Sequence, residues 1–217
     1  MNLDNFKNKT AKILLDIKAV NVQPKKPFKL TSGKLSPVYV DCRKIISHLK
    51  ERRLIIDMGC KLLKKKLNLK KIDFIAGGET AGIPYAAWIS EKLNKPMIYI
   101  RKKPKKFGKR SQIEGDFENN KKCILIEDLA TDGKSKEIFI NAMRENGLKV
   151  KDTFVIFYYN IFEKEKLELT KMGIKIHFLC SWHDILNEIK KTKILENKKI
   201  ESIEKFLFKP DEWESNE

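Results

Sequence analysis

Two adjacent carboxylates, Glu127 and Asp128, follow an apolar run over 123–126, and a polar turn over 131–135 comes soon after them. A helical pattern begins within this turn, at Lys134. Ligands of open α/β sheets bind outside the carboxyl ends of the strands, and the free N–H groups of a helix N-terminus bind phosphate. Carboxylates there would repel a phosphate unless they accept hydrogen bonds from a sugar that carries it. The segment predicts a pentose-phosphate site; the alternative is an ordinary strand, polar turn and capped helix.

The end of this turn, Gly133-Lys134-Ser135, is similar to the last residues of a P-loop. The P-loop pattern G-x-x-x-x-G-K-S requires a further glycine five residues before Gly133. This chain has Asp128 at that position. The spacing therefore excludes a nucleoside-triphosphate site of the P-loop type.

A series of alternating elements must position the turn. Hydrophobic periodicity predicts helices over 4–19, 50–68, 82–93, 134–146, 163–172 and 183–190, and strands over 72–76, 96–101, 122–127, 151–159 and 174–179. Strands separated by helices predict an α/β fold with a mainly parallel central sheet flanked by helices. Residues 21–43 contain two short β patterns, near Phe28 and Val38. Residues 102–120 are rich in lysine and have no hydrophobic period, which predicts a long loop that is either functional or disordered.

Length and charge limit the function classes. The 217 residues fit one domain, or one domain with a small appendage. The net charge of +17 raises the hypothesis of a nucleic-acid partner. However, only six of the 46 basic residues are arginine, the residue type that base recognition and bidentate phosphate contacts favour. We therefore expect a solvated lysine surface and no nucleic-acid partner, although an anionic substrate would still be attracted.

The remaining composition predicts a cytoplasmic protein without a membrane partner. Four scattered cysteines without a C-x-x-C pair predict buried free thiols: Cys42, Cys60, Cys123 and Cys180. The three histidines have no metal-ligand spacing. No uncharged apolar run approaches the ~20 residues of a membrane span, and the N-terminus lacks the apolar centre of a signal peptide.

Four segments, taken together and in this order, resemble the orotate phosphoribosyltransferases of the type I phosphoribosyltransferase family. FKLTSG and SPVYVDCR, within 28–43, are similar to the family's N-terminal hood, and GGETAGIP over 77–84 to its pyrophosphate-binding loop. YIRKKPKKFG with QIEG, within 99–115, is similar to its mobile catalytic loop. The acidic turn over 123–135 is similar to its signature for 5-phosphoribosyl-1-diphosphate (PRPP).

The resemblance implies the type I phosphoribosyltransferase fold. Residues 1–50 would form an N-terminal helix and hood over the base site, residues 51–208 a PRPP-binding core with the mobile loop 102–120, and residues 209–217 an acidic tail. Within this tail, the position at the chain end predicts that residues 211–217 fray. The implied reaction converts orotate and PRPP to orotidine 5′-monophosphate and pyrophosphate, in de novo pyrimidine (UMP) biosynthesis. PRPP would carry Mg²⁺, without direct protein ligands, and a homodimer would share its two active sites through the mobile loops.

The resemblance also implies roles for single residues. PRPP would be bound by Arg101, Lys102, Lys105, Glu127, Asp128, Leu129, Ala130, Thr131, Asp132, Gly133, Lys134 and Ser135. Of these, Lys105, Arg101 and Asp128 would be catalytic, because an oxocarbenium-like ribose and a departing diphosphate need positioning and charge stabilisation. Orotate would be bound by Thr131, Arg43 and Ser32, and a salt-bridged surface arginine is an equally good account of Arg43.

This chain departs from the family pattern at four positions. A lysine that is usual shortly before the hood's phenylalanine falls near Pro24, where Lys25 and Lys26 are possible substitutes. Phe107 stands where the loop usually has a histidine, Ala81 where the turn often has a lysine, and Lys134 where a small residue is more usual. Since phenylalanine cannot donate to pyrophosphate, either a neighbouring basic residue takes that task or the loop closes by apolar packing. Two alternative functions stay open: a phosphoribosyltransferase for another base, and a non-catalytic PRPP-binding regulator that also binds nucleic acid.

Overall fold

The structure is a computed structural model that describes residues 3–30, 33–104, 111–131 and 134–213. A six-stranded sheet in the order β10-β9-β8-β5-β6-β7 forms its centre. The strands are β5 (Phe74–Gly78), β6 (Met97–Ile100), β7 (Ile113–Glu114), β8 (Lys122–Ala130), β9 (Lys149–Tyr158) and β10 (Lys175–Ser181). Neighbouring strands are parallel except β6 and β7, which are antiparallel. The predicted mainly parallel sheet is confirmed.

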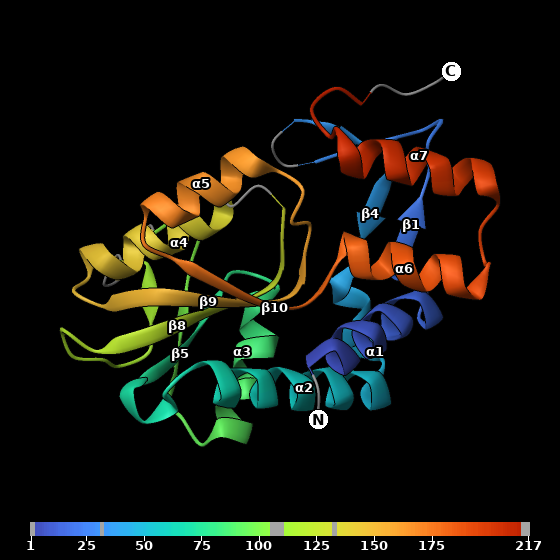
Figure 1. Ribbon diagram of the computed structural model, residues 1–217. Helices are drawn as coiled ribbons and strands as arrows, with labels where there is room; N and C mark the ends of the chain where they lie inside the picture. Colours follow the sequence, from blue (N-terminus) through green and yellow to red (C-terminus); the bar gives the residue numbers. More distant parts are fainter. Residues whose placement is uncertain (1–2, 31–32, 105–110, 132–133, 214–217) are drawn as a thin grey trace.

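Helices cover both faces of this sheet (Figure 1). Helices α4 (Lys134–Glu145) and α5 (Glu163–Lys171) lie over one face, and α2 (Leu49–Lys66) and α3 (Gly82–Leu93) lie over the other. The apolar residues 123–126 of β8 are at most 2% exposed. A strand of a parallel sheet that is covered on both faces has a continuous apolar run, which is why the sequence predicts it.

A second group of elements lies beside the sheet (Figure 1). It contains α1 (Leu3–Asp16), β1 (Val20–Val22), β2 (Phe28–Lys29), β3 (Leu35–Ser36), β4 (Val38–Val40), the 3-10 helix η1 (Cys42–Ser47), α6 (Trp182–Thr192) and α7 (Asn197–Phe208). A further 3-10 helix, η2 (Leu69–Lys71), leads into β5. Strands β1 and β4 are antiparallel, as are β2 and β3. Val38, Trp182 and Phe206 belong to one hydrophobic core, so the two ends of the chain are packed together.

The strand predicted over 122–127 continues to Ala130, so the acidic pair lies inside β8 rather than after it. Glu127 is paired with Val155, and Ala130 with Tyr158, in the parallel register with β9. The apolar run ends at Ile126, but the neighbouring strand continues and supplies backbone partners. The sequence pattern marks the end of the apolar run, whereas the neighbouring strand decides where β8 ends.

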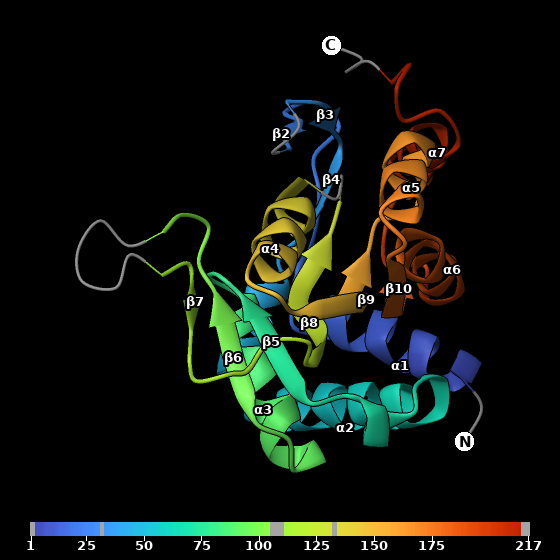
Figure 2. The same cartoon turned by 90° about the vertical axis from the view of Figure 1, so that its left-hand side faces the viewer.

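The loop predicted over 102–120 contains a strand. Residues Ile113–Glu114 form β7, which pairs with β6 at the outer edge of the sheet (Figure 2). Ile113 is buried at 3% exposure, and Gly115 follows it with a φ of +112°. A two-residue strand is too short to produce a hydrophobic period, so the sequence analysis misses it.

The C-terminus contains a helix that the sequence analysis does not predict. Helix α7 buries Ile203, Phe206 and Leu207. The Trp213 ring packs edge-on against Phe206, with 5.9 Å between ring centroids, and Asp211 accepts a hydrogen bond of 2.5 Å from Lys34. The acidic segment predicted to fray at 211–217 is therefore packed as far as Trp213.

Two further features concern the cysteines and the apolar character of the helices. All four cysteines are buried free thiols, as predicted. In the described part of the chain, no helix combines the length and the apolar character that crossing a membrane requires.

Candidate active site

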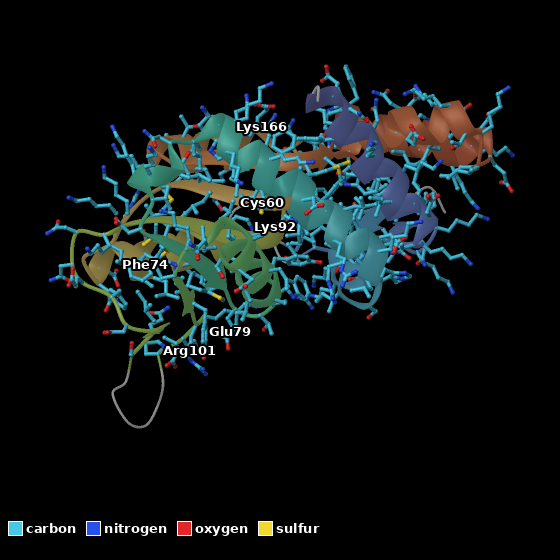
Figure 3. The ribbon with its side chains drawn as sticks, turned by 90° about the horizontal axis from the view of Figure 1, so that it is seen from below. Cys60, Phe74, Glu79, Lys92, Arg101 and Lys166 are labelled. Atoms are coloured by element: carbon cyan, nitrogen blue, oxygen red, sulfur yellow. The ribbon has the colours of Figure 1, made fainter. Side chains whose placement is uncertain are left out.

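The turns after β5 and β6 meet at the carboxyl edge of the central sheet, where β5 lies between β6 and β8. The N–H group of Glu79, just after β5, donates to the Ile100 carbonyl at the end of β6, at 2.9 Å. The N–H group of Lys102 donates to Oε2 of Glu79 at 2.8 Å. Glu79 and Arg101 accordingly lie at the same end of the molecule (Figure 3). The predicted pyrophosphate-binding loop and the start of the predicted mobile loop are thus hydrogen-bonded to each other.

Two glycines on either side of the turn after β5 leave room for the Glu127 carboxylate: Gly78 ends β5 and Gly82 begins α3. A Cβ atom at Gly82 would lie 2.5 Å from Oε1 of Glu127 and would also overlap the Ile126 carbonyl oxygen. A Cβ atom at Gly78 would overlap Oε1 of Glu127 and lie 2.7 Å from the Phe139 ring. Because no other residue type avoids these overlaps, the Gly-rich turn and the acidic pair are parts of one site.

The acidic pair is buried, with Glu127 and Asp128 each 6% exposed. Burial raises the pKa of Glu127 to about 7; the positive charge of Lys136 is the main effect that opposes this rise, and the negative charge of neighbouring Asp128 adds to it. Burial also raises the pKa of Asp128, opposed by Lys136 and by Arg43. Within the described residues, Oε1 of Glu127 has no hydrogen-bond partner. Such a buried acceptor is suited to a ligand that brings hydroxyl donors.

Lys136 is a site residue that the sequence analysis misses. Its side chain is 2% exposed, and its Nζ lies 2.7 Å from the Leu129 carbonyl oxygen, to which it donates. The same Nζ lies 3.9 Å from Oε2 of Glu127. Lys136 shares a helix face with Phe139, Ile140 and Met143, all buried. A lysine on the apolar face of a predicted helix is the sequence signal that could have identified it.

Arg43 reaches the site from the N-terminal region. Its Nε lies 3.9 Å from Oδ2 of Asp128, and its side chain is 65% exposed. The preceding segment is fixed by Tyr85 of α3, whose hydroxyl donates to the Cys42 carbonyl at 2.7 Å. The structure thus brings the predicted orotate ligand Arg43 to the acidic pair and leaves its guanidinium accessible.

The predicted loop residues Arg101 and Lys102 lie at the base of the β6–β7 arm. The Arg101 N–H group donates to Gln112 O at 2.8 Å, and Gln112 Nε2 donates back to Arg101 O at 2.9 Å. The Arg101 side chain is 32% exposed and its Nη1 lies 3.9 Å from Glu114. Lys102 is exposed. The structure therefore fixes the backbone direction at the start of the loop.

The signature turn is described in part. Leu129 and Ala130 end β8, Thr131 follows, and Ser135 lies in the first turn of α4 with its Oγ 3.5 Å from Nζ of Lys136. The N-terminus of α4 therefore follows the acidic pair closely, as the phosphate-site prediction requires. The other predicted ligands fall outside what the structure describes: Ser32, Lys105, Asp132 and Gly133, together with the side chain of Lys134.

The burial of Glu127 leads to a prediction about stability. The folded protein keeps this proton up to a pKa of about 7, whereas the ordinary value is 4.5. Between these values the folded state binds more protons than the unfolded state, so stability is lost as the pH rises through the window. Glu127→Gln removes this loss. The free energy of unfolding of Glu127→Gln minus that of wild type should be about 2 kcal/mol larger at pH 8 than at pH 5. Urea denaturation of both proteins at the two pH values measures this difference.

The exposed Glu201→Gln of α7 is the matched control, and its difference from wild type should be the same at both pH values. An equal difference for Glu127→Gln at pH 5 and pH 8 would contradict the raised pKa.

Comparison with known proteins extends over most of the chain. A curated protein of Cereibacter sphaeroides named orotate phosphoribosyltransferase is 43% identical over 205 residues, which covers 94% of this chain and 88% of that protein. The UMP synthase structure of Leishmania donovani matches 92% of this chain with a TM-score of 0.78 and 28% identity, and the chain spans 42% of that protein. The orotate phosphoribosyltransferase structure of Aeropyrum pernix has a TM-score of 0.72 and 27% identity, covering 83% of this chain and 99% of that one. No protein-family model matches the chain.

Proposed function

The chain belongs to the orotate phosphoribosyltransferase family, and we propose that the buried acidic pair of β8 binds the ribose of PRPP in that family's reaction. The enzyme transfers the 5-phosphoribosyl group of PRPP to orotate and releases pyrophosphate, which gives orotidine 5′-monophosphate for pyrimidine biosynthesis. Its fold is that of the type I phosphoribosyltransferases. The observation that supports the proposed site best is Oε1 of Glu127, a buried acceptor without a partner in the described residues.

The ribose and its 5′-phosphate would be held by the end of β8 and the start of α4. Glu127 and Asp128 would accept hydrogen bonds from the ribose hydroxyls. Their negative charge would also stabilise the electron-poor ribose that forms as the diphosphate leaves. The 5′-phosphate would be bound by Thr131, Gly133 and Ser135, because the first N–H groups of a helix are free to bind an anion.

The diphosphate would face the turn after β5 and the loop after β6. Arg101, Lys102 and Lys105 would bind it as it leaves, and closure of the loop would exclude water and prevent hydrolysis of PRPP. The hydrogen bond from Lys102 N–H to Glu79 supports this arrangement, because it holds the start of the basic loop against the turn after β5.

PRPP would bring Mg²⁺ into the site. In the ranges that the structure describes, no group of three or more His, Cys, Asp or Glu side chains is placed to hold a metal ion. An ion carried by PRPP would not require such a group of protein ligands. When bound, the ion neutralises charge on the diphosphate.

Orotate would lie under the hood formed by residues 1–50. The exposed guanidinium of Arg43 would pair with the orotate carboxylate, with Ser32 and Thr131 as further donors. The position of Arg43 beside Asp128 supports this role, because the base must reach the anomeric carbon of a ribose held by the acidic pair.

A product assay tests this function. The protein is incubated with PRPP and Mg²⁺ and with orotate, uracil or guanine in turn, and the nucleotide products are separated. Orotidine 5′-monophosphate from orotate alone is the expected result. A product from uracil or guanine would favour a phosphoribosyltransferase for another base. Salt-sensitive nucleic-acid binding without any product would favour the regulator.

The proposed homodimer with shared sites is tested by mixing two inactive variants. Lys105→Ala and Asp128→Asn subunits should complement each other, because each heterodimer contains one site with an intact loop and an intact acidic pair. Random exchange makes half of the dimers heterodimers, so activity should recover to about a quarter of the wild-type value per site. Subunit exchange is verified by mass spectrometry, with unmixed variants as controls. No recovery after exchange would show that each chain closes its own site.

The proposed location is the cytoplasm, where a reducing environment would keep the four buried thiols free.

A further inference from the structure

Lys136 is a buried cation whose surroundings are defined by the structure. Its side chain is 2% exposed, with one hydrogen bond of 2.7 Å to the Leu129 carbonyl and the Glu127 carboxylate at 3.9 Å. A buried charge is costly unless it is paired and hydrogen-bonded. Lys136 and the acidic pair therefore compensate one another, and the site depends on all three side chains.

We propose that Lys136 is a positioning residue of the PRPP site, an internal counter-charge that favours the ionised forms of Glu127 and Asp128 and anchors the Leu129 carbonyl. This inference rests on the proposed function of the acidic pair. Lys136 does not bind substrate itself, because its side chain is almost fully covered. It acts through the two carboxylates, which accept hydrogen bonds with both oxygen atoms, and carry a negative charge beside the ribose, only when they are ionised.

Other charged groups face the pair from neighbouring elements. Lys102, at the loop stem, and Arg43, from η1, favour ionisation of Glu127, whereas neighbouring Asp128 opposes it. Lys102 and Arg43 are exposed, so solvent and salt screen their charges. Lys136 is buried and has the largest opposing effect on the raised pKa values of both carboxylates. It is therefore the cation on which their charge depends most.

Three weakly acidic groups also face Asp128 from the hood and α3. Burial raises the pKa of Tyr39, Cys42 and Tyr85, and the negative charge of Asp128 adds to each rise. These groups are neutral near pH 7 and supply no counter-charge to the pair.

The hydrogen bond of Lys136 also fixes the strand end. Leu129 lies between the acidic pair and the phosphate turn, and its carbonyl is held from α4 by Nζ of Lys136. The next residue, Ala130, accepts a hydrogen bond of 2.9 Å from the Tyr159 N–H group. Loss of the Lys136 ammonium would remove one of these two hydrogen bonds. The backbone between the acidic pair and the phosphate site would then be held less firmly.

The test compares Lys136→Met with wild type between pH 6 and pH 9. Methionine keeps the length of the side chain and removes its charge. PRPP binding is measured by calorimetry, and KM and kcat by the orotate assay. In wild type, PRPP affinity should rise with pH through about 7, as the Glu127 carboxyl ionises. In Lys136→Met the same rise in PRPP affinity should occur at a pH that is higher by about one unit or more.

The loss of the Lys136 charge should affect KM for PRPP more than kcat. At pH 7, KM for PRPP should be about tenfold higher in Lys136→Met than in wild type, with a smaller change in kcat. At pH 9, the KM values of the two proteins should be closer. Lys136→Arg should retain the wild-type pH dependence. Lys149→Met, an exposed lysine at the start of β9, makes the same change in net charge and should have no effect.

Unchanged pH dependence in a folded Lys136→Met would overturn the inference, as would an equal shift in Lys149→Met. If Lys136→Met does not fold, the double variant Glu127→Gln/Lys136→Met should fold, because the two buried charges are removed together. Failure of the double variant to fold better than Lys136→Met would overturn the inference too. The calorimetric measurement does not need orotate, so absence of product from wild type would refute the proposed reaction alone.

Discussion

Asp128→Asn is expected to lower kcat/KM for PRPP by about a thousandfold. Asparagine keeps the size of the side chain but replaces one carboxylate oxygen with an NH2 group, which cannot accept a hydrogen bond from a ribose hydroxyl. A hydrogen bond to a charged group contributes roughly 1.5–3 kcal/mol, and one such bond is lost together with the negative charge beside the ribose. The buried position of Asp128 leaves little room for water to replace them.

Steady-state kinetics with saturating orotate measure this effect, and circular dichroism checks that the variant is folded. The matched control is Asp16→Asn, which makes the same change at an exposed residue at the end of α1 and should leave kcat/KM unchanged. A folded Asp128→Asn enzyme with wild-type kcat/KM would exclude the acidic pair from ribose binding.

Lys105→Ala is expected to lower kcat by about 10²-fold or more, because one preorganised donor at a developing anion contributes roughly 2.7–4 kcal/mol. PRPP affinity should fall much less, since the ribose and the 5′-phosphate are held by other groups. Lys105 itself lies outside the described residues, but the stem that leads to it is fixed by the bond from Lys102 N–H to Glu79. The loop therefore starts beside the proposed diphosphate site.

Single-turnover measurements with PRPP and orotate separate the chemical step from binding. Lys151→Ala, an exposed lysine of β9, is the control for the loss of one positive charge. An unchanged kcat in Lys105→Ala would remove this lysine from the mechanism and direct attention to the other basic residues of the loop.

The sequence alone predicts the α/β core well. Each helix and strand predicted between residues 50 and 190 is present, with ends within a few residues. The reason is local: buried parallel strands have continuous apolar runs, and helices covering them repeat their apolar residues every three to four positions. The predicted site turn follows from the same logic, because the ends of such strands can be located along the chain.

The sequence alone does not predict features that depend on neighbours. Strand β8 continues through Glu127 and Asp128 because β9 supplies backbone partners, and β7 exists because β6 pairs with it. Helix α7 has an apolar face, but the hood and Phe162 give that face its partner.

The residues and the order of the proposed site were therefore determined by the sequence: a buried strand, two carboxylates, a phosphate turn and a basic loop. The tertiary structure decided their electrostatics. Packing places Lys136, from the helix that follows, against the acidic pair, and Arg43 beside the pair from a segment far away in the chain. It also raises the pKa of Glu127 to about 7 by burial. Charge and burial depend on which elements enclose a side chain, and no local pattern of residues specifies that enclosure.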